Sequence, residues 1–281
     1  MKTALVIGAS RGIGRQIALT LSENGYQVGV AAKTTESSDH LPGSIYTVIE
    51  ETKQKGGIAY PFKCNARNEQ DIRSTVQGCI SRFGHLDVAI YNAGAITWKP
   101  MLETPLKRFE LMNEVNIRGA YIMIQEVLPH FLNRKSGRIV LVSPPIYSRF
   151  FKGKVPYSVS KVGLSILTMG LSHEIKGTGV TITSLWPTTA IKSHVTDVKH
   201  FPDRVLRKPE IFADAVLKMV EEKTDKLNGK CLLDEDYLRS EGMTDFTKYR
   251  CDPDHEPPRM MPRVLPDLTV AEEDQSLDSK L

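Results

Sequence analysis

The sequence predicts an α/β fold, a doubly wound parallel sheet of seven strands with helices on both faces (a Rossmann fold). Two observations predict it. First, an apolar run over 3–7 leads directly into a glycine-rich turn, which is followed by apolar residues at helical spacing. Second, segments with the patterns of strands and helices alternate up to about residue 233. Parallel strands need crossover connections, usually helices, so this alternation is typical of a parallel sheet.

The first thirty residues make up one strand–helix–strand unit. The strand covers 3–7. Ile13 and Ile17 then begin a helical spacing of apolar residues, and Asn24-Gly25 is a typical helix-ending pair. The second strand is expected over 27–32.

The later elements follow from the same patterns and from their end signals. Gly56-Gly57 and Gly84 each end a helix, Asn68 is a favourable N-cap, and Pro156 suits the first turn of a helix. The other expected strands cover 58–64, 86–91, 138–142, 180–185 and 230–233. The other expected helices cover 44–55, 68–83, 105–132, 156–176 and 209–222.

The alternation stops at about residue 234, and five prolines crowd the span 253–266. Proline lacks the backbone donor that helices and sheets use. We therefore expect one domain over 1–235 and a proline-rich extension over 236–281. This extension should be an arm that wraps the body or a partner subunit.

The composition excludes several classes of protein. Hydrophobic residues at 41% and charged residues at 25% are ordinary globular values. The net charge of +4 is spread along the chain without a Lys/Arg block, so we expect no nucleic-acid partner. No apolar run approaches the ~18 residues of a membrane span, and 3–7 is too short for a signal peptide, so we expect no membrane insertion and no cleaved leader.

Four cysteines are scattered along the chain without a Cys-x-x-Cys pair or a histidine at ligand spacing. We therefore expect no metal site and no disulfide framework. Reduced thiols in an intracellular compartment are the better interpretation.

The glycine-rich turn predicts a phosphate-binding site. Glycine accepts positive φ and lets the backbone approach a pyrophosphate closely. The helix that follows presents free N–H groups and the positive end of its dipole to the phosphates. We expect a dinucleotide to be bound through Gly8, Ser10, Arg11, Gly12, Ile13 and Gly14.

The end of the second strand indicates which dinucleotide is bound. An acidic residue there would contact a free ribose 2′-hydroxyl, whereas a 2′-phosphate requires a cation. The strand ends with Lys33, no carboxylate follows before Glu36, and Arg11 lies in the glycine turn. These residues favour NADP(H), although Lys33 could also be an ordinary solvated lysine.

Tyr157 and Lys161 are four residues apart in an expected helix, so their side chains lie on one face. A free phenol has a pKa of about 10, too high for proton transfer at neutral pH, and a neighbouring ammonium favours the phenolate. The two residues are therefore candidates for an acid/base pair.

These motifs occur in the order of a known family. Gly8-x-x-x-Gly12-x-Gly14 is followed by Tyr91-Asn92-Ala93-Gly94, Asn116, Tyr157-x-x-x-Lys161 and Trp186-Pro187. Over about residues 1–235 the chain resembles the short-chain dehydrogenase/reductase family. Ser143-Pro144-Pro145 and other details resemble a hydroxysteroid dehydrogenase-like branch, whose typical members carry a C-terminal sterol-carrier domain that we do not find in these 281 residues.

The resemblance implies a role for each matching residue. Tyr157 would be the general acid in carbonyl reduction and the base in alcohol oxidation. Lys161 would bind the nicotinamide ribose and lower the pKa of Tyr157, helped by the charge of the oxidised nicotinamide. Asn116 would position a water in a proton relay. Asn92, Ala93 and Gly94 would line the adenosine side, and the Ala190 backbone would bind the nicotinamide carboxamide.

Three positions depart from the family pattern. The catalytic serine normally lies about thirteen residues before the tyrosine, where this chain has Pro144. Asn65 replaces the usual adenine-contacting aspartate, and its amide can still accept or donate a hydrogen bond. Thr188 replaces a glycine.

Ser143 is the nearest candidate for the missing serine. A one-residue slip on an extended strand reverses the direction of a side chain. Either the loop turns Ser143 inward, or Tyr157 acts without a serine. The loss of one such donor would cost on the order of 3 kcal/mol of transition-state stabilisation.

We therefore predict an NADP(H)-dependent oxidoreductase that interconverts a carbonyl and a secondary alcohol on an apolar small molecule, with a lipid as one candidate. The alternative, motivated by Pro144, is a catalytically weak or inactive dinucleotide- or lipid-binding module.

Helices 105–132 and 156–176 are expected to pair copies of the chain into a homo-oligomer. His194 and His200 could contact substrate or lie on the surface, and Phe150 and Trp186 could line a pocket or belong to the core.

The last three residues, Ser279-Lys280-Leu281, match the peroxisomal import signal. In a eukaryote we expect a peroxisomal enzyme that binds the import receptor. In a bacterium the triplet would be accidental and the enzyme cytoplasmic.

Overall fold

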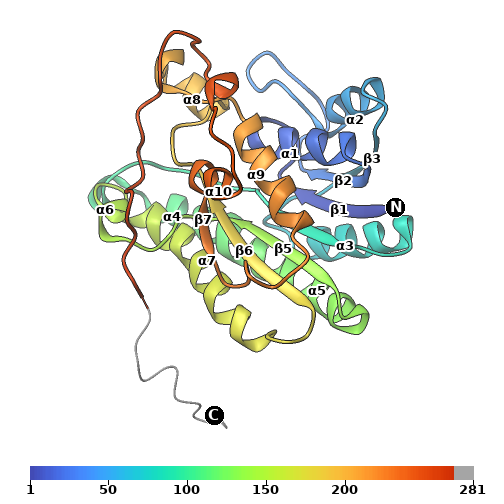
Figure 1. Ribbon diagram of the computed structural model, residues 1–281. Helices are drawn as coiled ribbons and strands as arrows, with labels where there is room; N and C mark the ends of the chain where they lie inside the picture. The colour runs from blue at the N-terminus through green and yellow to red at the C-terminus, as the bar shows by residue number, and fades with distance from the viewer. Residues whose placement is uncertain (269–281) are drawn as a thin grey trace.

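The computed structural model describes residues 1–268 and confirms the predicted parallel sheet (Figure 1). Its strands lie in the order β3-β2-β1-β4-β5-β6-β7, and every neighbouring pair is parallel. The strands are β1 (Lys2–Ile7), β2 (Tyr26–Ala32), β3 (Ile58–Lys63), β4 (Val88–Tyr91), β5 (Gly137–Val142), β6 (Val180–Trp186) and β7 (Cys231–Leu233). From β1 the chain continues to β2 on one side, and from β4 it continues to β5 on the other side. A crevice therefore opens beyond the carboxyl ends of β1 and β4.

Two helical layers cover the sheet (Figure 1). The longer helices are α1 (Gly12–Glu23), α2 (Ile45–Gln54), α3 (Glu69–Phe83), α5 (Gly119–Arg134), α7 (Val155–Glu174) and α9 (Glu210–Glu221). The shorter ones are α4 (Leu106–Met112), α6 (Ser148–Phe151), α8 (His194–Val198) and α10 (Asp234–Ser240). Helices α1, α2 and α9 pack on one face of the sheet, and α3, α5 and α7 on the other.

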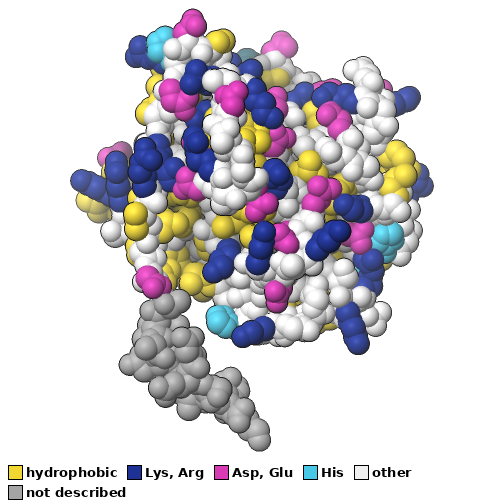
Figure 2. Space-filling model, viewed as in Figure 1, with side chains coloured by type: hydrophobic (Ala, Val, Ile, Leu, Met, Phe, Trp, Pro, Cys, Tyr) yellow, Lys and Arg dark blue, Asp and Glu magenta, His cyan; other side chains and the backbone are white. Residues whose placement is uncertain are grey.

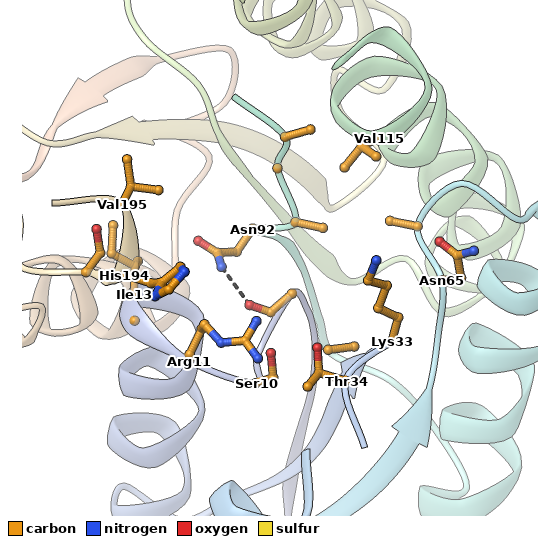
Figure 3. A pocket seen from close by; sticks show the side chains of 18 of the residues that line it. Ser10, Arg11, Ile13, Lys33, Thr34, Asn65, Asn92, Val115, His194 and Val195 are labelled. Atoms are coloured by element: carbon orange, nitrogen blue, oxygen red, sulfur yellow. Dashed lines mark hydrogen bonds between the residues drawn. The ribbon is translucent and has the colours of Figure 1, made fainter. Parts of the chain in front are cut away.

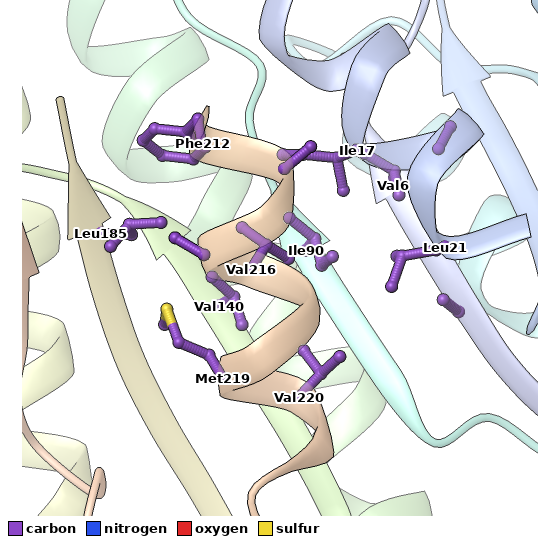
Figure 4. Close-up of a cluster of buried hydrophobic side chains, with 14 of the residues drawn as sticks. Val6, Ile17, Leu21, Ile90, Val140, Leu185, Phe212, Val216, Met219 and Val220 are labelled. Carbon is purple, nitrogen blue, oxygen red and sulfur yellow. The ribbon is translucent and has the colours of Figure 1, made fainter. Parts of the chain in front are cut away.

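Successive side chains of β1 point to opposite faces of the sheet, so this strand contributes to both cores. Val6 belongs to the core under α1 and α9, whereas Leu5 and Ile7 belong to the core under α3 and α5. Figure 4 shows the first of these cores, in which Val216 of α9 packs between Ile17 of α1 and the strand residues. Strands buried on both faces read as nearly continuous apolar runs, which is why the sequence pattern identified them.

The expected helix over 105–132 differs in detail. It consists of α4, a π-helical segment over Asn113–Arg118, and α5, which contains Pro129 and continues to Arg134. Such π-helical turns are frequent at functional sites. Helices α6, α8 and α10 were not expected, because they have only four, five and seven residues, too few for an apolar periodicity.

Within the described residues, the chain after residue 240 contacts the body of the domain. Phe246 and Tyr249 are buried in the core under α9, and α10 crosses residue 235, the expected end of the domain. Further along, the N–H groups of Met260 and Met261 both donate to the Thr188 carbonyl at 2.9 and 3.2 Å. The arm thus contacts the loop that follows β6.

Arg207 is the ionic link between that loop region and the arm. It is only 1% exposed and forms ion pairs with Glu235 of α10, at 2.9 Å, and with Glu256 of the arm. Its backbone N–H donates to the Ala190 carbonyl at 2.8 Å. Arg207 therefore links the loop after β6 through its backbone, and α10 and the arm through its guanidinium.

Helix apolarity, possible metal ligands and the state of the cysteines also bear on the class of protein. None of the helices within residues 1–268 has the length and apolarity that crossing a membrane would need. In the same residues, no group of three or more His, Cys, Asp or Glu side chains is placed to hold a metal ion. All four cysteines are free thiols. The Ser279-Lys280-Leu281 triplet lies outside the described residues.

We predict that Arg207→Gln lowers the free energy of unfolding by about 3 kcal/mol, because two carboxylates lose their buried partner. Urea denaturation would measure the change. The matched control is Lys248→Gln, which breaks an exposed ion pair with Asp214 of 3.2 Å and should cost less than about 1 kcal/mol. Equal losses in the two variants would contradict the linking role of Arg207.

Candidate active site

A cleft of about 610 Å³ opens at the carboxyl ends of β1, β2 and β4, at the point where the strand order reverses (Figure 3). It is lined by ten of the predicted cofactor-binding residues: Gly8, Ser10, Arg11, Gly12, Ile13, Lys33, Asn65, Asn92, Ala93 and Gly94. Of the other predicted residues, Gly14 lies beneath the turn, and Tyr157, Lys161 and Ala190 lie beyond the lining.

The glycine turn fits tightly against the end of β4. Gly8 has a φ of +91°, and a Cβ added to it would lie 2.4 Å from the Ala93 backbone nitrogen. A Cβ on Gly14 would lie 2.1 Å from the Gly8 carbonyl oxygen. The Asn92 side-chain amide donates to that same carbonyl at 2.8 Å, as Figure 3 shows. Only glycine allows this approach, which shapes a cradle for a pyrophosphate.

The cradle itself is open at Gly12. This glycine has a φ of +55°, and a Cβ added there would meet only the Ser193 side chain, at 3.7 Å. The residues present therefore fit a dinucleotide: the helix α1 N-terminus faces a space that a side chain would fill.

The charges around the cleft are positive. Arg11, Lys33 and Arg67 are in the lining, and none of the described lining residues is acidic. Arg11 is held by the carbonyls of Pro42 and Gly43 at 3.0 and 2.8 Å, and burial lowers its pKa. In Figure 3 the Lys33 ammonium reaches into the cleft. Arg67 is paired with Glu114 at 2.7 Å, so Arg11 and Lys33 are the cations most available to an anion.

Tyr157 and Lys161 lie together on α7, each only 5% exposed. The Lys161 ammonium donates to the Val142 carbonyl at the end of β5 at 3.0 Å and lies 5.8 Å from the centre of the Trp186 ring. Burial lowers the pKa of Lys161 to about 8 and raises the pKa of Tyr157 well above its usual value. We expected a lowered pKa for Tyr157. The protein by itself does not show it, because desolvation of the phenol raises this pKa and dominates.

Asn116 is fully buried in the π-helical segment and joins two parts of the site. Its Oδ1 accepts from the Ala95 N–H at 2.7 Å, and its Nδ2 donates to the Ala95 carbonyl at 3.0 Å and to Ser160 Oγ at 2.8 Å. A Cβ added to Gly94 would lie 3.5 Å from Lys161 Nζ and 3.6 Å from Asn116 Oδ1. Both side chains therefore converge on Gly94, at the end of the cleft.

The structure directs Ser143 away from Tyr157. Ser143 is fully buried, and its Oγ lies 3.2 Å from Ser165 Oγ, at hydrogen-bonding distance. Ser165 is eight residues beyond Tyr157 on α7, or about 12 Å along the helix axis. Ser165 donates to the Pro144 carbonyl at 2.5 Å. Of the two possibilities that the sequence left open, this geometry favours a tyrosine without a serine partner.

An aromatic cluster borders the tyrosine. The centre of the Phe150 ring is 6.4 Å from that of Tyr157 and 5.6 Å from that of Trp186, edge to face. Met112 is buried in the same cluster, with Ile96 packed against it. Phe150 and Trp186 thus form an apolar wall beside Tyr157.

Sequence reasoning missed several lining residues. Ser193 and Val195 enter the cleft with His194 from α8, a helix too short to predict, and Thr34, Arg67 and Val115 also line it. The reciprocal hydrogen bonds between Ser193 and Thr196 begin α8, and a serine–threonine pair at that spacing was an available signal. His200 is not in the lining.

Residues 2–200 match the family model described as short chain dehydrogenase. The chain belongs to the short-chain dehydrogenase family. Membership makes this domain an NAD(P)-dependent oxidoreductase domain, which agrees with the dinucleotide-shaped cleft.

Curated relatives place the chain near one branch of the short-chain dehydrogenases. It is 36% identical over 257 residues to hydroxysteroid dehydrogenase-like protein 2 of Danio rerio, covering 90% of this chain and 61% of the relative. It is 35% identical over 283 residues to the Xenopus laevis protein of that name, covering 99% of this chain and 66% of the relative. The chain thus spans about two thirds or less of these relatives.

Solved structures agree with the fold. A short chain dehydrogenase from Mycobacterium thermoresistibile is 33% identical, with a TM-score of 0.85 over 92% of this chain and 93% of that one. A 7α-hydroxysteroid dehydrogenase is 23% identical, with a TM-score of 0.72 over 83% of this chain and 92% of that one. The second match supports the fold alone.

We predict that Gly12→Ala weakens NADPH binding at least tenfold, because its methyl group enters the cradle while touching no backbone. Fluorescence titration with NADPH would measure this. Gly25→Ala is the matched control: its φ is +83°, so it carries a similar backbone cost of roughly 1 kcal/mol, but it lies in open space outside the cleft. Unchanged NADPH affinity in Gly12→Ala would contradict the assignment of the cradle.

Proposed function

We propose that this short-chain dehydrogenase interconverts a carbonyl and a secondary alcohol with NADP(H), and that Tyr157 is the general acid/base. The observation that carries the proposal is the convergence of Lys161 and Asn116 on Gly94, at the inner end of the dinucleotide cleft and one helical turn from Tyr157. When bound, the nicotinamide would supply or accept the hydride.

The residues of the chain would handle the proton and the binding. Tyr157 would protonate the carbonyl oxygen during reduction and take the proton back during oxidation. The Lys161 ammonium lies on the same face of α7 and would stabilise the phenolate, as would any positive charge brought by the oxidised nicotinamide. Gly94 leaves the space between Lys161 and Asn116 open for a water or a ribose hydroxyl.

The rival function is a dinucleotide- or lipid-binding module without turnover. Pro144 in the usual serine position and the direction of Ser143 toward Ser165 favour it. Against it, a pure binder needs neither a buried lysine beside a buried tyrosine nor an asparagine that bridges to them through Ser160. The loss of one carbonyl-polarising donor, on the order of 3 kcal/mol, would slow turnover without abolishing it.

We predict that Tyr157→Phe abolishes NADPH-dependent reduction of a carbonyl panel while NADPH still binds. Ser143→Ala should retain activity within about threefold, because its hydroxyl is directed to Ser165. Steady-state rates and NADPH fluorescence would separate the two effects. If the unmodified protein binds NADPH but reduces no carbonyl, the binding module is the correct function. A large loss of activity in Ser143→Ala would show that Ser143 takes part in catalysis.

The preference for NADP(H) is supported by the positive lining of the cleft and the absence of acidic residues from its described part. We predict that Lys33→Ala weakens NADPH affinity roughly tenfold and leaves NADH affinity within about twofold, because only NADPH carries the 2′-phosphate. Titration with both cofactors would measure the difference. Tighter NADH binding by the unmodified protein would contradict the preference.

The substrate, assembly and location are further parts of the proposal. The wall formed by Phe150 and Trp186 suits an apolar substrate, for which a lipid is one candidate. Exposed Tyr121 on α5 and exposed Val159 and Ile166 on α7 support pairing of these helices in a homo-oligomer, which analytical ultracentrifugation would test. If the source is a eukaryote, import into peroxisomes would be tested by deleting residues 279–281 and imaging the tagged protein.

A further inference from the structure

A second hollow, of about 420 Å³, adjoins the dinucleotide cleft. Ala95 lines the cleft, and the next residue, Ile96, lines the hollow. Likewise, Val195 of α8 lines the cleft, and Lys199, just after α8, lines the hollow. The two spaces therefore share the β4 loop and α8 as walls, and a molecule in the hollow would lie next to the inner end of the cleft.

Positive charge predominates among the charged side chains that line the hollow. Lys99, Arg108 and Lys199 line it, against a single carboxylate, Glu103. A fourth cation, Lys154, is not in the lining, but its ammonium lies over the ring of Trp98, which is. Figure 2 shows Lys and Arg side chains gathered on the left side of the molecule, in the region between α8 and α6 in Figure 1.

Trp98 is the centre of this group. The ammonium of Lys154 is 5.6 Å from the centre of the Trp98 ring and 4.2 Å from that of Phe150. The ammonium of Lys199 is 5.2 Å from the centre of the Trp98 ring. Aromatic faces stabilise a cation only modestly, and they do not neutralise its charge.

These cations lack acidic partners. Among residues 1–268, no ion pair joins Lys99, Arg108, Lys154 or Lys199 to a carboxylate. Nearby surface cations differ, as Lys192 pairs with Asp203 at 3.0 Å. Burial lowers the pKa of Lys154, with no acidic group opposing the shift. A half-buried ammonium without a counter-charge is unfavourable, and a bound anion would relieve it.

The other wall of the hollow is apolar and leads to the reacting centre. Ile96 lines the hollow and packs against the cluster of Met112, Phe150 and Tyr157. Phe150 contacts the Lys154 ammonium on one side and the Tyr157 ring on the other. An elongated molecule with its charged end at Trp98 would therefore place its apolar body along Ile96, on the side of the hollow that packs against the cluster of Tyr157.

We propose that this hollow binds the anionic end, a carboxylate or a phosphate, of an amphiphilic substrate whose carbonyl or alcohol group reaches Tyr157. The inference rests on the proposed function and narrows its substrate class. Lys199 is the principal binding residue of the lining, and Lys154, over the ring of Trp98, adds an unpaired positive charge beside it.

A negatively charged membrane is the competing occupant of these cations. Met101, Leu102 and Leu106, near the hollow, are 61%, 100% and 69% exposed. However, Lys99, Arg108 and Lys199 line a concave space, and Lys154 and Lys199 lie over the ring of Trp98, whereas residues that bind a lipid surface must project from a convex one. The geometry thus favours a small anion.

The test compares two ketones that differ only in charge, a mid-chain oxo fatty acid and its methyl ester. With NADPH, the unmodified protein should show a kcat/KM at least tenfold higher for the acid, the range expected of a charge-assisted contact. In the Lys154→Gln/Lys199→Gln double variant the ratio should fall to about one. Lys218→Gln, an exposed lysine of α9 outside both spaces, should keep the ratio of the unmodified protein.

A binding measurement separates the anion site from catalysis. Trp98 and Trp186 are the two tryptophans of the chain, so their fluorescence reports on this region. Titration with dodecanoate, dodecyl phosphate and dodecanol in the presence of NADP⁺ should show at least tenfold tighter binding of the two anions than of the alcohol. The double variant should lose this preference while keeping its circular dichroism spectrum. The carboxylate and phosphate titrations show which anion is preferred.

The outcomes distinguish the anion site from the oxidoreductase function on which it rests. If the acid and its ester are reduced equally well, the anion site is wrong and the oxidoreductase function stands. If no carbonyl is reduced but the anions still bind through Lys154 and Lys199, the anion site stands and the proposed function fails. If the double variant loses binding to phosphatidylserine vesicles while its acid-to-ester ratio is unchanged, the cations serve a membrane surface and the inference is overturned.

Discussion

The close approach of two backbones, at Gly8 and Ala93, is the constraint on which the rest of the site depends. No side chain fits between the turn after β1 and the loop after β4, since a Cβ on Gly8 would lie 2.4 Å from the Ala93 nitrogen. The Asn92 amide closes the contact through the Gly8 carbonyl. The floor of the dinucleotide cleft is therefore made of main chain, which presents N–H groups and leaves room for phosphates.

That contact also determines where Asn116 and Lys161 lie relative to the cleft. The β4 loop continues to Ala95, whose N–H and carbonyl both bond to Asn116. Asn116 in turn donates to Ser160, the residue before Lys161 on α7. The π-helical segment is what brings the Asn116 amide to face this loop, at the cost of regular α-helical bonding. The cleft and the Tyr157–Lys161 pair are thus connected through a single chain of hydrogen bonds.

The region around α8 and the aromatic wall is built differently, from short segments held by long-range contacts. α8 has only five residues, and the loop before it is held by Arg207, which binds the Ala190 carbonyl through its backbone and the arm through its guanidinium. Met261 of the arm contacts the Tyr147 hydroxyl at 3.1 Å, beside Phe150. The arm therefore supports the aromatic wall next to Tyr157. Such contacts join residues up to 114 positions apart, which local patterns cannot reveal.

The sequence alone determined that strands and helices alternate to form a parallel sheet. It also determined the glycine turn and the spacing of Tyr157 and Lys161. These features depend on local rules: apolar runs, glycine at positive φ and the periodicity of one helix. Only the tertiary structure decided that Ser143 is directed to Ser165, that α8 and Lys199 join two adjoining spaces, and that Lys154 lies unpaired over two aromatic rings. The direction of a side chain at the end of a strand, and the charges that surround it, depend on which distant segments pack there, and no spacing in the sequence encodes that.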